Sequence, residues 1–192
     1  MENIFAVIAG RRSIRKYKSE PVSREQVIQL VEAANWAPSG MNEQGWTFYA
    51  VAGAKMEALR EVGRQVINLR MPPEAERTED QKIFAQWFGT LGDAPAAIVA
   101  CCPKTEDAPR RKMLLESASA AFQNLLLAAA AIGLGGCWMT GLLAKQEQIC
   151  KLLDIPADKE IVAITPLGYP AGQPEAPARK VAADKLVTFI DM

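Results

Sequence analysis

The chain of 192 residues contains no histidine. Histidine is the side chain that titrates near neutral pH, and it is a common ligand of protein-bound metals. Its absence excludes a Ser-His-Asp or Cys-His nucleophile pair within the chain, and it excludes imidazole as a general base. If the protein is an enzyme, we expect a bound cofactor to carry the chemistry.

The chain also lacks an excess of charge and a cysteine motif. Its 22 Lys and Arg residues balance 22 Asp and Glu residues, which argues against nucleic acid or an anionic membrane as a partner. None of the four cysteines forms a Cys-x-x-Cys pair, so no metal site is predicted. Cys101 and Cys102 lie in an apolar run, where small buried side chains are the expected interpretation.

Long hydrophobic runs are scarce. The longest, residues 125–134, is too short to cross a bilayer. The N-terminus does not have the pattern of a secretory signal, because Arg11 and Arg12 follow its apolar residues instead of preceding them. We therefore expect a cytoplasmic protein.

Hydrophobic periodicity predicts helices mixed with a few strands. Ser23 and Gln26 have the spacing of a capping box and open a helix that ends before Pro38. Further helices are expected over residues 4–10, 55–69, 83–88, 113–132 and 144–153, and strands over 46–51, 96–102, 161–167 and 186–190. This mixture predicts a three-layer sandwich of the α+β or α/β class. The helix over 113–132 carries almost no charge, so it should be buried on nearly all sides.

Residues 11–18, Arg-Arg-Ser-Ile-Arg-Lys-Tyr-Lys, form the densest polar cluster. Arginine can bind phosphate with two parallel hydrogen bonds, and Ser13 adds a neutral donor. The composition is equally compatible with a solvated face and with an anion site. A nucleic-acid surface is disfavoured, because the rest of the chain offers no matching basic stripe.

Two loop clusters are further candidates. Residues 38–46, Pro-Ser-Gly-Met-Asn-Glu-Gln-Gly-Trp, combine small and amide side chains that allow a flat ligand to approach closely. A plain helix-to-strand loop has the same composition. Residues 133–141, Gly-Leu-Gly-Gly-Cys-Trp-Met-Thr-Gly, suggest a dinucleotide fingerprint, but they follow a helix where that fingerprint requires a strand.

Taken in order, these segments resemble the nitroreductase family of flavin mononucleotide (FMN) enzymes. The matching pieces span nearly the whole chain: residues 11–15, 37–42 with Gln44 and Trp46, 93–95, 133–141, 167–170 and 179–180. The resemblance implies an α+β fold, a three-layer α/β/α sandwich with a mixed antiparallel sheet flanked by helices. It also implies an FMN-binding domain of residues 1–170. Residues 171–192 would be an arm exchanged in a homodimer.

The resemblance assigns cofactor contacts as well. One segment would hold the ribityl chain, phosphate and pyrimidine end of the flavin: Arg11, Arg12, Ser13 and Arg15. Arg179 would complete the phosphate site. The partner subunit would supply Pro38, Ser39, Gly40 and Asn42. A loop along the isoalloxazine would consist of Trp138, Met139, Thr140 and Gly141. No side chain would be catalytic, because the flavin carries the hydride.

The implied activity is FMN-dependent hydride transfer from NADH or NADPH to a nitroaromatic, a quinone or an activated alkene. Use of one pocket by both substrates predicts ping-pong kinetics. A specialised branch such as a reductive dehalogenase, and a flavin sensor or storage protein with little turnover, are the alternatives. Thr140 stands where many members that reduce nitroaromatics carry glutamate.

Residues 70–88 match no motif of the family. They could form a lid whose Trp87 and Phe88 stack on an aromatic acceptor. We favour the simpler interpretation, in which these two side chains anchor the segment to the core.

Overall fold

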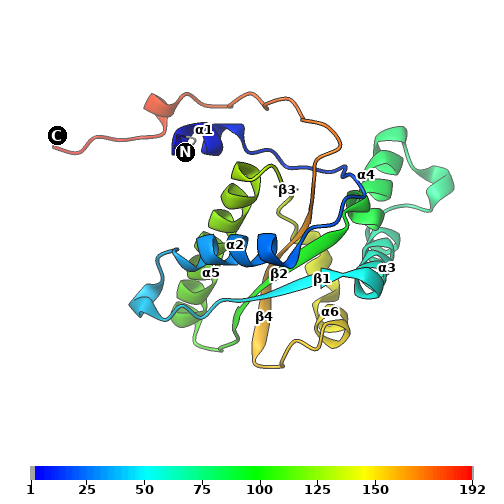
Figure 1. The fold of residues 1–192 in the computed structure, drawn as a ribbon, viewed down its shortest axis with the longest axis horizontal. Helices are drawn as coiled ribbons and strands as arrows, with labels where there is room; N and C mark the ends of the chain where they lie inside the picture. The colour runs from blue at the N-terminus through cyan, green and yellow to red at the C-terminus, as the bar shows by residue number, and fades with distance from the viewer. Residues whose placement is uncertain (1–2, 192) are drawn as a thin grey trace.

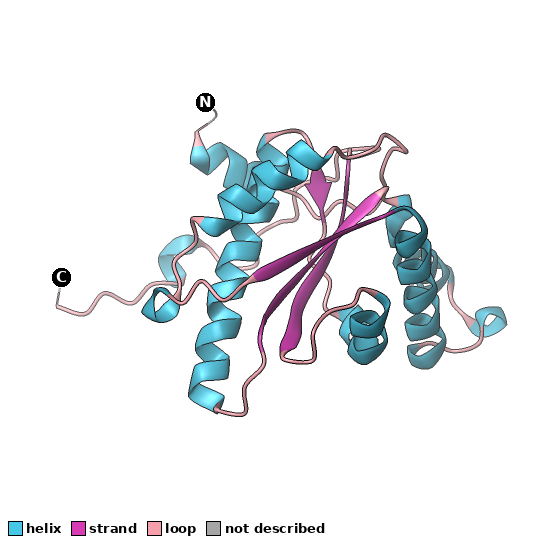
Figure 2. Ribbon diagram, turned by 60° about the horizontal axis from the view of Figure 1, so that its bottom comes forward, coloured by secondary structure: helices cyan, strands magenta, loops and turns pink. Residues whose placement is uncertain are grey.

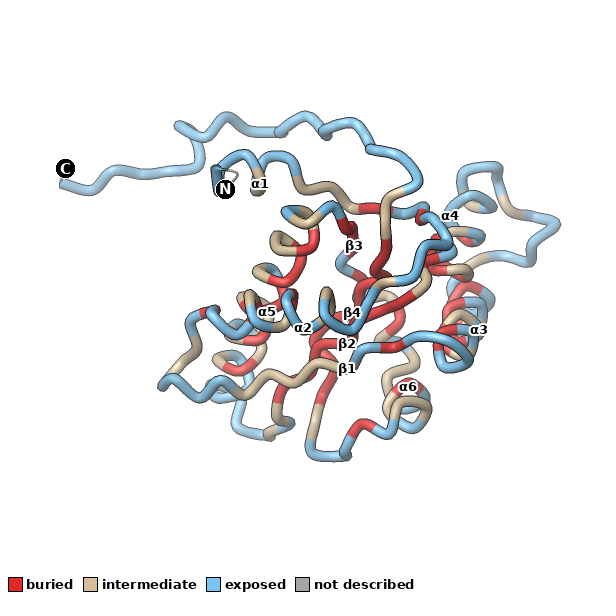
Figure 3. The backbone as a smooth tube through the Cα atoms, viewed as in Figure 1, coloured by how far each residue is buried: buried red, intermediate tan, exposed pale blue. Residues whose placement is uncertain are grey.

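A computed structural model of the protein describes residues 3–191. Its sheet has four strands in the order β1-β2-β4-β3, and every neighbouring pair is antiparallel. The strands are β1 (Thr47–Ala52), β2 (Ala96–Pro103), β3 (Gly135–Gly136) and β4 (Lys159–Gly168). The central strands β2 and β4 are buried along almost their whole length (Figure 3). Burial on both faces explains why their sequences are continuously apolar.

Helices cover both faces of this sheet (Figures 1 and 2). They are α1 (Ile4–Gly10), α2 (Arg24–Asn35), α3 (Gly53–Arg70), α4 (Glu79–Thr90), α5 (Ala108–Ala131) and α6 (Gln146–Leu152). Helices α2 and α5 share one apolar cluster with the sheet, and α3, α4 and α6 share another on the opposite side. The three-layer α+β architecture is confirmed.

Local signals account for most helix boundaries. The capping box of α2 is formed, with both Ser23 and Gln26 bonded as expected. A second capping box, of Thr78 and Gln81, starts α4 four residues earlier than predicted. Asp107 accepts a hydrogen bond from the Arg110 amide, so α5 begins at Ala108 and not at residue 113.

The prediction that α5 is buried on nearly all sides is only partly right. Seven of its residues are buried, Phe122 and Leu125 completely, whereas Leu115, Leu127 and Ala130 are half-buried. Within residues 3–191, α5 is the single helix with the length and apolar composition to cross a membrane. A core helix meets the same criteria, which makes this weak evidence for a membrane span.

The strand expected over residues 186–190 is wrong. This segment follows a short 3-10 turn, Ala183–Lys185, and has no strand partner. Residues 171–191 are exposed throughout and leave the body of the sandwich (Figure 1). The apolar residues of this segment suggested a strand, but the pattern does not show whether a sheet edge lies close enough to pair with it. The fourth strand of the sheet is β3, whose two glycines carry no strand signal.

Candidate functional site

The basic segment lies beside β3 and is fixed by its backbone. Ser13 forms an isolated bridge with Gly136, and the Ile14 amide donates to the Gly136 carbonyl at 3.0 Å. The side chains of Ile14 and Tyr17 are buried. Burial also raises the pKa of Tyr17 well above its ordinary value, so the neutral phenol serves as a donor to the Ile14 carbonyl at 2.7 Å. The two apolar residues of the run thus anchor it.

The glycines of β3 permit this close approach. A Cβ on Gly135 would collide with the Ile14 side chain, and one on Gly136 would lie 2.5 Å from Thr165 Oγ1 and 2.9 Å from Leu126 Cδ2. Such contacts force neighbouring atoms to move. Gly135 therefore allows Ile14 to lie against the sheet edge, and Gly136 fits against Thr165 and Leu126, although the two glycines open no dinucleotide-binding helix.

A cavity of about 260 Å³ lies where these segments meet. Arg11, Arg12 and both β3 glycines line it, together with residues of α1 and α5. The Arg12 Nη1 donates to the Ala9 carbonyl at 2.6 Å and to the Arg11 carbonyl at 3.0 Å. Its Nε is buried and has no acceptor among the described residues. A buried donor without an acceptor costs roughly 1–3 kcal/mol, and an anionic group in this cavity would satisfy it.

A second cavity, of about 750 Å³, adjoins the first at Ile14 and Gln173, which line both. Its other lining residues are Arg15, Lys16, Ile83, Phe84, Trp87, Cys137, Trp138, Ala171, Gly172 and Pro174. The Arg15 guanidinium lies 5.1 Å from the centre of the Trp87 ring, within cation–π range. Phe88 is buried in the core, so anchoring is the right interpretation for Phe88, whereas Trp87 also faces this cavity.

Cys137 is a buried residue that lines the second cavity together with Arg15. Burial raises the pKa of its thiol, and the positive charges of Arg15 and Arg11 act in the opposite direction. The composition left open whether the basic run was solvated or formed a site. The unpaired Nε of Arg12 in the first cavity favours a site.

Residues 138–141 divide between the cavity and the core. Trp138 lines the second cavity and packs edge-on against Phe122, with ring centres 4.7 Å apart. Met139 is 3% exposed, and both its backbone groups bond to Ile164, which leaves its side chain in the core. Thr140 is exposed, and Gly141 packs against Phe88.

The loop over residues 38–44 lies elsewhere on the subunit. The Gly40 amide donates to Ser117 Oγ at 3.1 Å, near the start of α5, whereas the first cavity contacts Ala130 near its end. Thirteen residues of helix separate these points by about 20 Å. One chain therefore does not bring Pro38, Ser39, Gly40 and Asn42 together with Arg12.

This loop is nevertheless tightly specified. Met41, Asn42 and Gln44 have φ angles of 54°, 55° and 47°, a left-handed conformation that costs free energy for residues with a side chain. Hydrogen bonds from Gln44 to Ser39 Oγ and Asn42 Oδ1 hold it. Arg179 lies in the exposed C-terminal extension, and no hydrogen bond or ion pair joins it to residues 11–15 within the described chain.

Comparison with known proteins identifies the family of the chain. A family model described as the nitroreductase family matches residues 8–169. The chain belongs to the nitroreductase family. It is 33% identical over 174 residues to an Archaeoglobus fulgidus protein with the provisional name NADH dehydrogenase/NAD(P)H nitroreductase, with 88% of this chain and 87% of the relative covered.

Other relatives of this nitroreductase-family chain differ in named activity. An iodotyrosine deiodinase of Thermotoga neapolitana is 28% identical over 186 residues, covering 94% of this chain and 96% of that protein. A solved nitroreductase with bound FMN from Desulfitobacterium hafniense has a TM-score of 0.77 and 25% identity, and each chain is covered completely. The family and the fold are thus established together.

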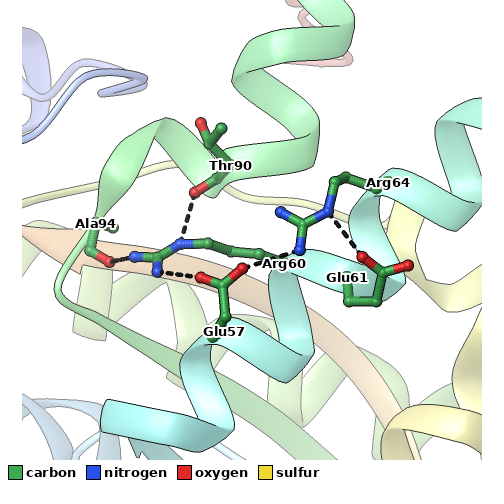
Figure 4. Close-up of polar contacts among 6 residues, drawn as sticks. All are labelled: Glu57, Arg60, Glu61, Arg64, Thr90 and Ala94. Carbon is green, nitrogen blue, oxygen red and sulfur yellow. Dashed lines mark hydrogen bonds and ion pairs between the residues drawn. The ribbon is translucent and has the colours of Figure 1, made fainter.

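One supporting element was missed by the sequence reasoning. Leu91, Gly92 and Asp93 all have left-handed φ angles, and a Cβ on Gly92 would collide with the Arg15 carbonyl. The guanidinium of Arg60 donates to the Thr90 and Ala94 carbonyls, at 3.0 and 2.8 Å, and thereby fastens both ends of this turn (Figure 4). In this nitroreductase-family chain the turn backs the basic segment. The sequence marked it only by Gly92 and by the matching residues 93–95, which carried no assigned role.

Proposed function

We propose that this protein binds FMN and transfers hydride from NADH or NADPH to a small organic acceptor. The observation that carries the proposal is the buried, unpartnered N–H of Arg12, in a cavity walled by Arg11 and two glycines. A phosphate group supplies the acceptor that this guanidinium lacks. The nitroreductase names of the relatives and the FMN bound by a structural neighbour support the same function.

The chain's own residues divide the work of holding the cofactor. Arg11, Arg12 and Ser13 would bind its phosphate and ribityl groups, and the flat backbone at β3 would allow close contact. Arg15 would supply positive charge at the pyrimidine end, where negative charge gathers on reduction. When bound, FMN supplies the acceptance and donation of hydride. A chain without histidine can therefore perform this reaction.

A homodimer would complete the site. The loop with Ser39, Gly40 and Asn42 lies about 20 Å along α5 from the first cavity, so the partner's copy of that loop is the one proposed to reach it. The half-buried flank of α5 and exposed apolar residues of the extension, among them Leu186 and Phe189 at 73% and 68%, offer surface for that contact. Arg179 would then act near the partner's phosphate site.

Steady-state kinetics test this proposal. We expect FMN-loaded protein to oxidise NADH or NADPH steadily when menadione or nitrofurazone is added. Double-reciprocal plots at several acceptor concentrations should give parallel lines, because donor and acceptor take turns in one pocket. Bound FMN that never turns over would instead indicate a sensor or storage protein, and intersecting lines would contradict the shared pocket.

A further inference from the structure

The second cavity combines aromatic rings and positive charge. Three aromatic side chains line it, Phe84, Trp87 and Trp138, and two cations, Arg15 and Lys16. No aspartate or glutamate is among its lining residues. Arg15 would face the pyrimidine end of the flavin, and a neutral aromatic substrate would need only the rings, so Lys16 calls for a separate explanation.

The charges that face this cavity are not neutralised locally. Within residues 3–191 neither Arg15 nor Lys16 forms an ion pair, whereas most arginines of α3 and α5 do. The nearest acidic residues on α4 are Glu79 and Asp80 in its first turn, and Glu79 pairs with Lys82 at 3.4 Å. The cavity therefore keeps a positive potential that favours an anion.

Helix α4 presents its rings in a fixed cluster. Phe84 lies 5.4 Å from Trp87 and 5.7 Å from Phe88, centre to centre, and Phe88 is anchored in the core. Phe84 is nevertheless 45% exposed and its neighbour Ile83 64% exposed. Trp87 also carries a buried Nε1–H that has no acceptor in the described chain. An aromatic molecule in the cavity would cover the exposed apolar surface of Phe84 and Ile83.

We propose that this cavity selects planar aromatic acceptors that carry a carboxylate. The rings of α4 would contact the aromatic plane, and Lys16 would attract the carboxylate, while Arg15 faces the flavin. This selectivity rests on the proposed function, because the acceptor must reach the flavin. For a nitro compound, one NADH and one proton would reduce the nitro group to nitroso, with release of water and NAD⁺.

A matched pair of substrates tests the selectivity. 4-Nitrobenzoate and its methyl ester carry the same reducible group and differ in charge. We expect kcat/KM to be higher for 4-nitrobenzoate than for its methyl ester. Lys16→Met should lower the ratio of the two kcat/KM values roughly three- to fivefold, which is the effect of losing a partly exposed charge pair. Lys16→Arg should restore it. Lys18→Met removes a nearby exposed lysine that does not line the cavity and should leave the preference unchanged.

A binding measurement separates this inference from the activity. Benzoate and benzamide carry no nitro group and therefore serve as ligands that are not reduced. Their dissociation constants can be measured from the change that binding causes in the absorption spectrum of the bound flavin. The intact protein should bind benzoate more tightly, and Lys16→Met should reduce the difference. If the FMN-loaded protein reduces neither these nitro compounds nor menadione, the proposed function fails. If both are reduced but charge makes no difference, or Lys16→Met leaves the preference intact, the selectivity is wrong while the function stands.

Discussion

Replacing Arg12 with methionine is expected to weaken FMN binding by about 10- to 150-fold, which is the contribution of hydrogen bonds to a charged partner. The buried Nε of Arg12 has no acceptor within the described chain. An anion that enters the cavity would supply the missing acceptor and would thereby be stabilised. Arg12→Lys should have an intermediate effect, because a lysine keeps the charge but loses the planar fork. Quenching of FMN fluorescence on titration with protein measures the change.

A matched control excludes a general effect of charge. Arg24 is exposed at the start of α2, and Arg24→Met removes one positive charge from a residue that does not line the cavity. It should leave FMN affinity unchanged. Because Arg12 also donates to the Ala9 carbonyl, thermal melts of each variant must accompany the titration. Unchanged FMN affinity in a folded Arg12→Met protein would contradict the assigned phosphate site.

Replacing Gly136 with alanine is expected to lower the stability of the folded protein. The added Cβ would lie 2.5 Å from Thr165 Oγ1, a hydroxyl that accepts from the Cys137 amide and donates to the Pro166 carbonyl. Overpacking of this kind costs roughly 1–3 kcal/mol, which for a chain of this size lowers Tm by roughly 2–10 °C. Differential scanning calorimetry measures this loss.

Gly10→Ala is the control for glycine replacement. A Cβ on Gly10 meets no atom within 4 Å, and alanine is the better residue at the end of a helix. Its Tm should be unchanged or slightly higher. A Gly136→Ala protein as stable as this control would show that the packing of β3 against Thr165 and Leu126 does not require a glycine.

The layers of the fold could be predicted from the sequence because their signals are local. Strands β2 and β4 are continuous apolar runs, and the boundary of α2 follows from its capping box. Local signals did not suffice for two other segments: a strand was wrongly predicted over residues 186–190, and β3 was not predicted. Sheet membership there depends on which segments lie side by side, and the two glycines of β3 join the sheet through backbone groups that have no side-chain signature.

The site was predictable in its parts but not in its assembly. Composition could not decide between a solvated face and an anion site for residues 11–18, and the decision came from the burial of Ile14 and from the unpaired Nε of Arg12. The left-handed turn at Gly92 and its attachment to Arg60 involve distant parts of the chain. The loop around Gly40 packs far from Arg12, so its proposed role depends on a second subunit. The hydrophobic periodicity of one chain does not show contacts between subunits.

Titration of the purified protein with FMN, followed by visible absorption and gel filtration, tests the central claim most directly. The account predicts one FMN bound per chain, retained as a yellow colour through gel filtration and lost in Arg12→Met at low protein concentration. A colourless protein that takes up no added FMN would contradict it.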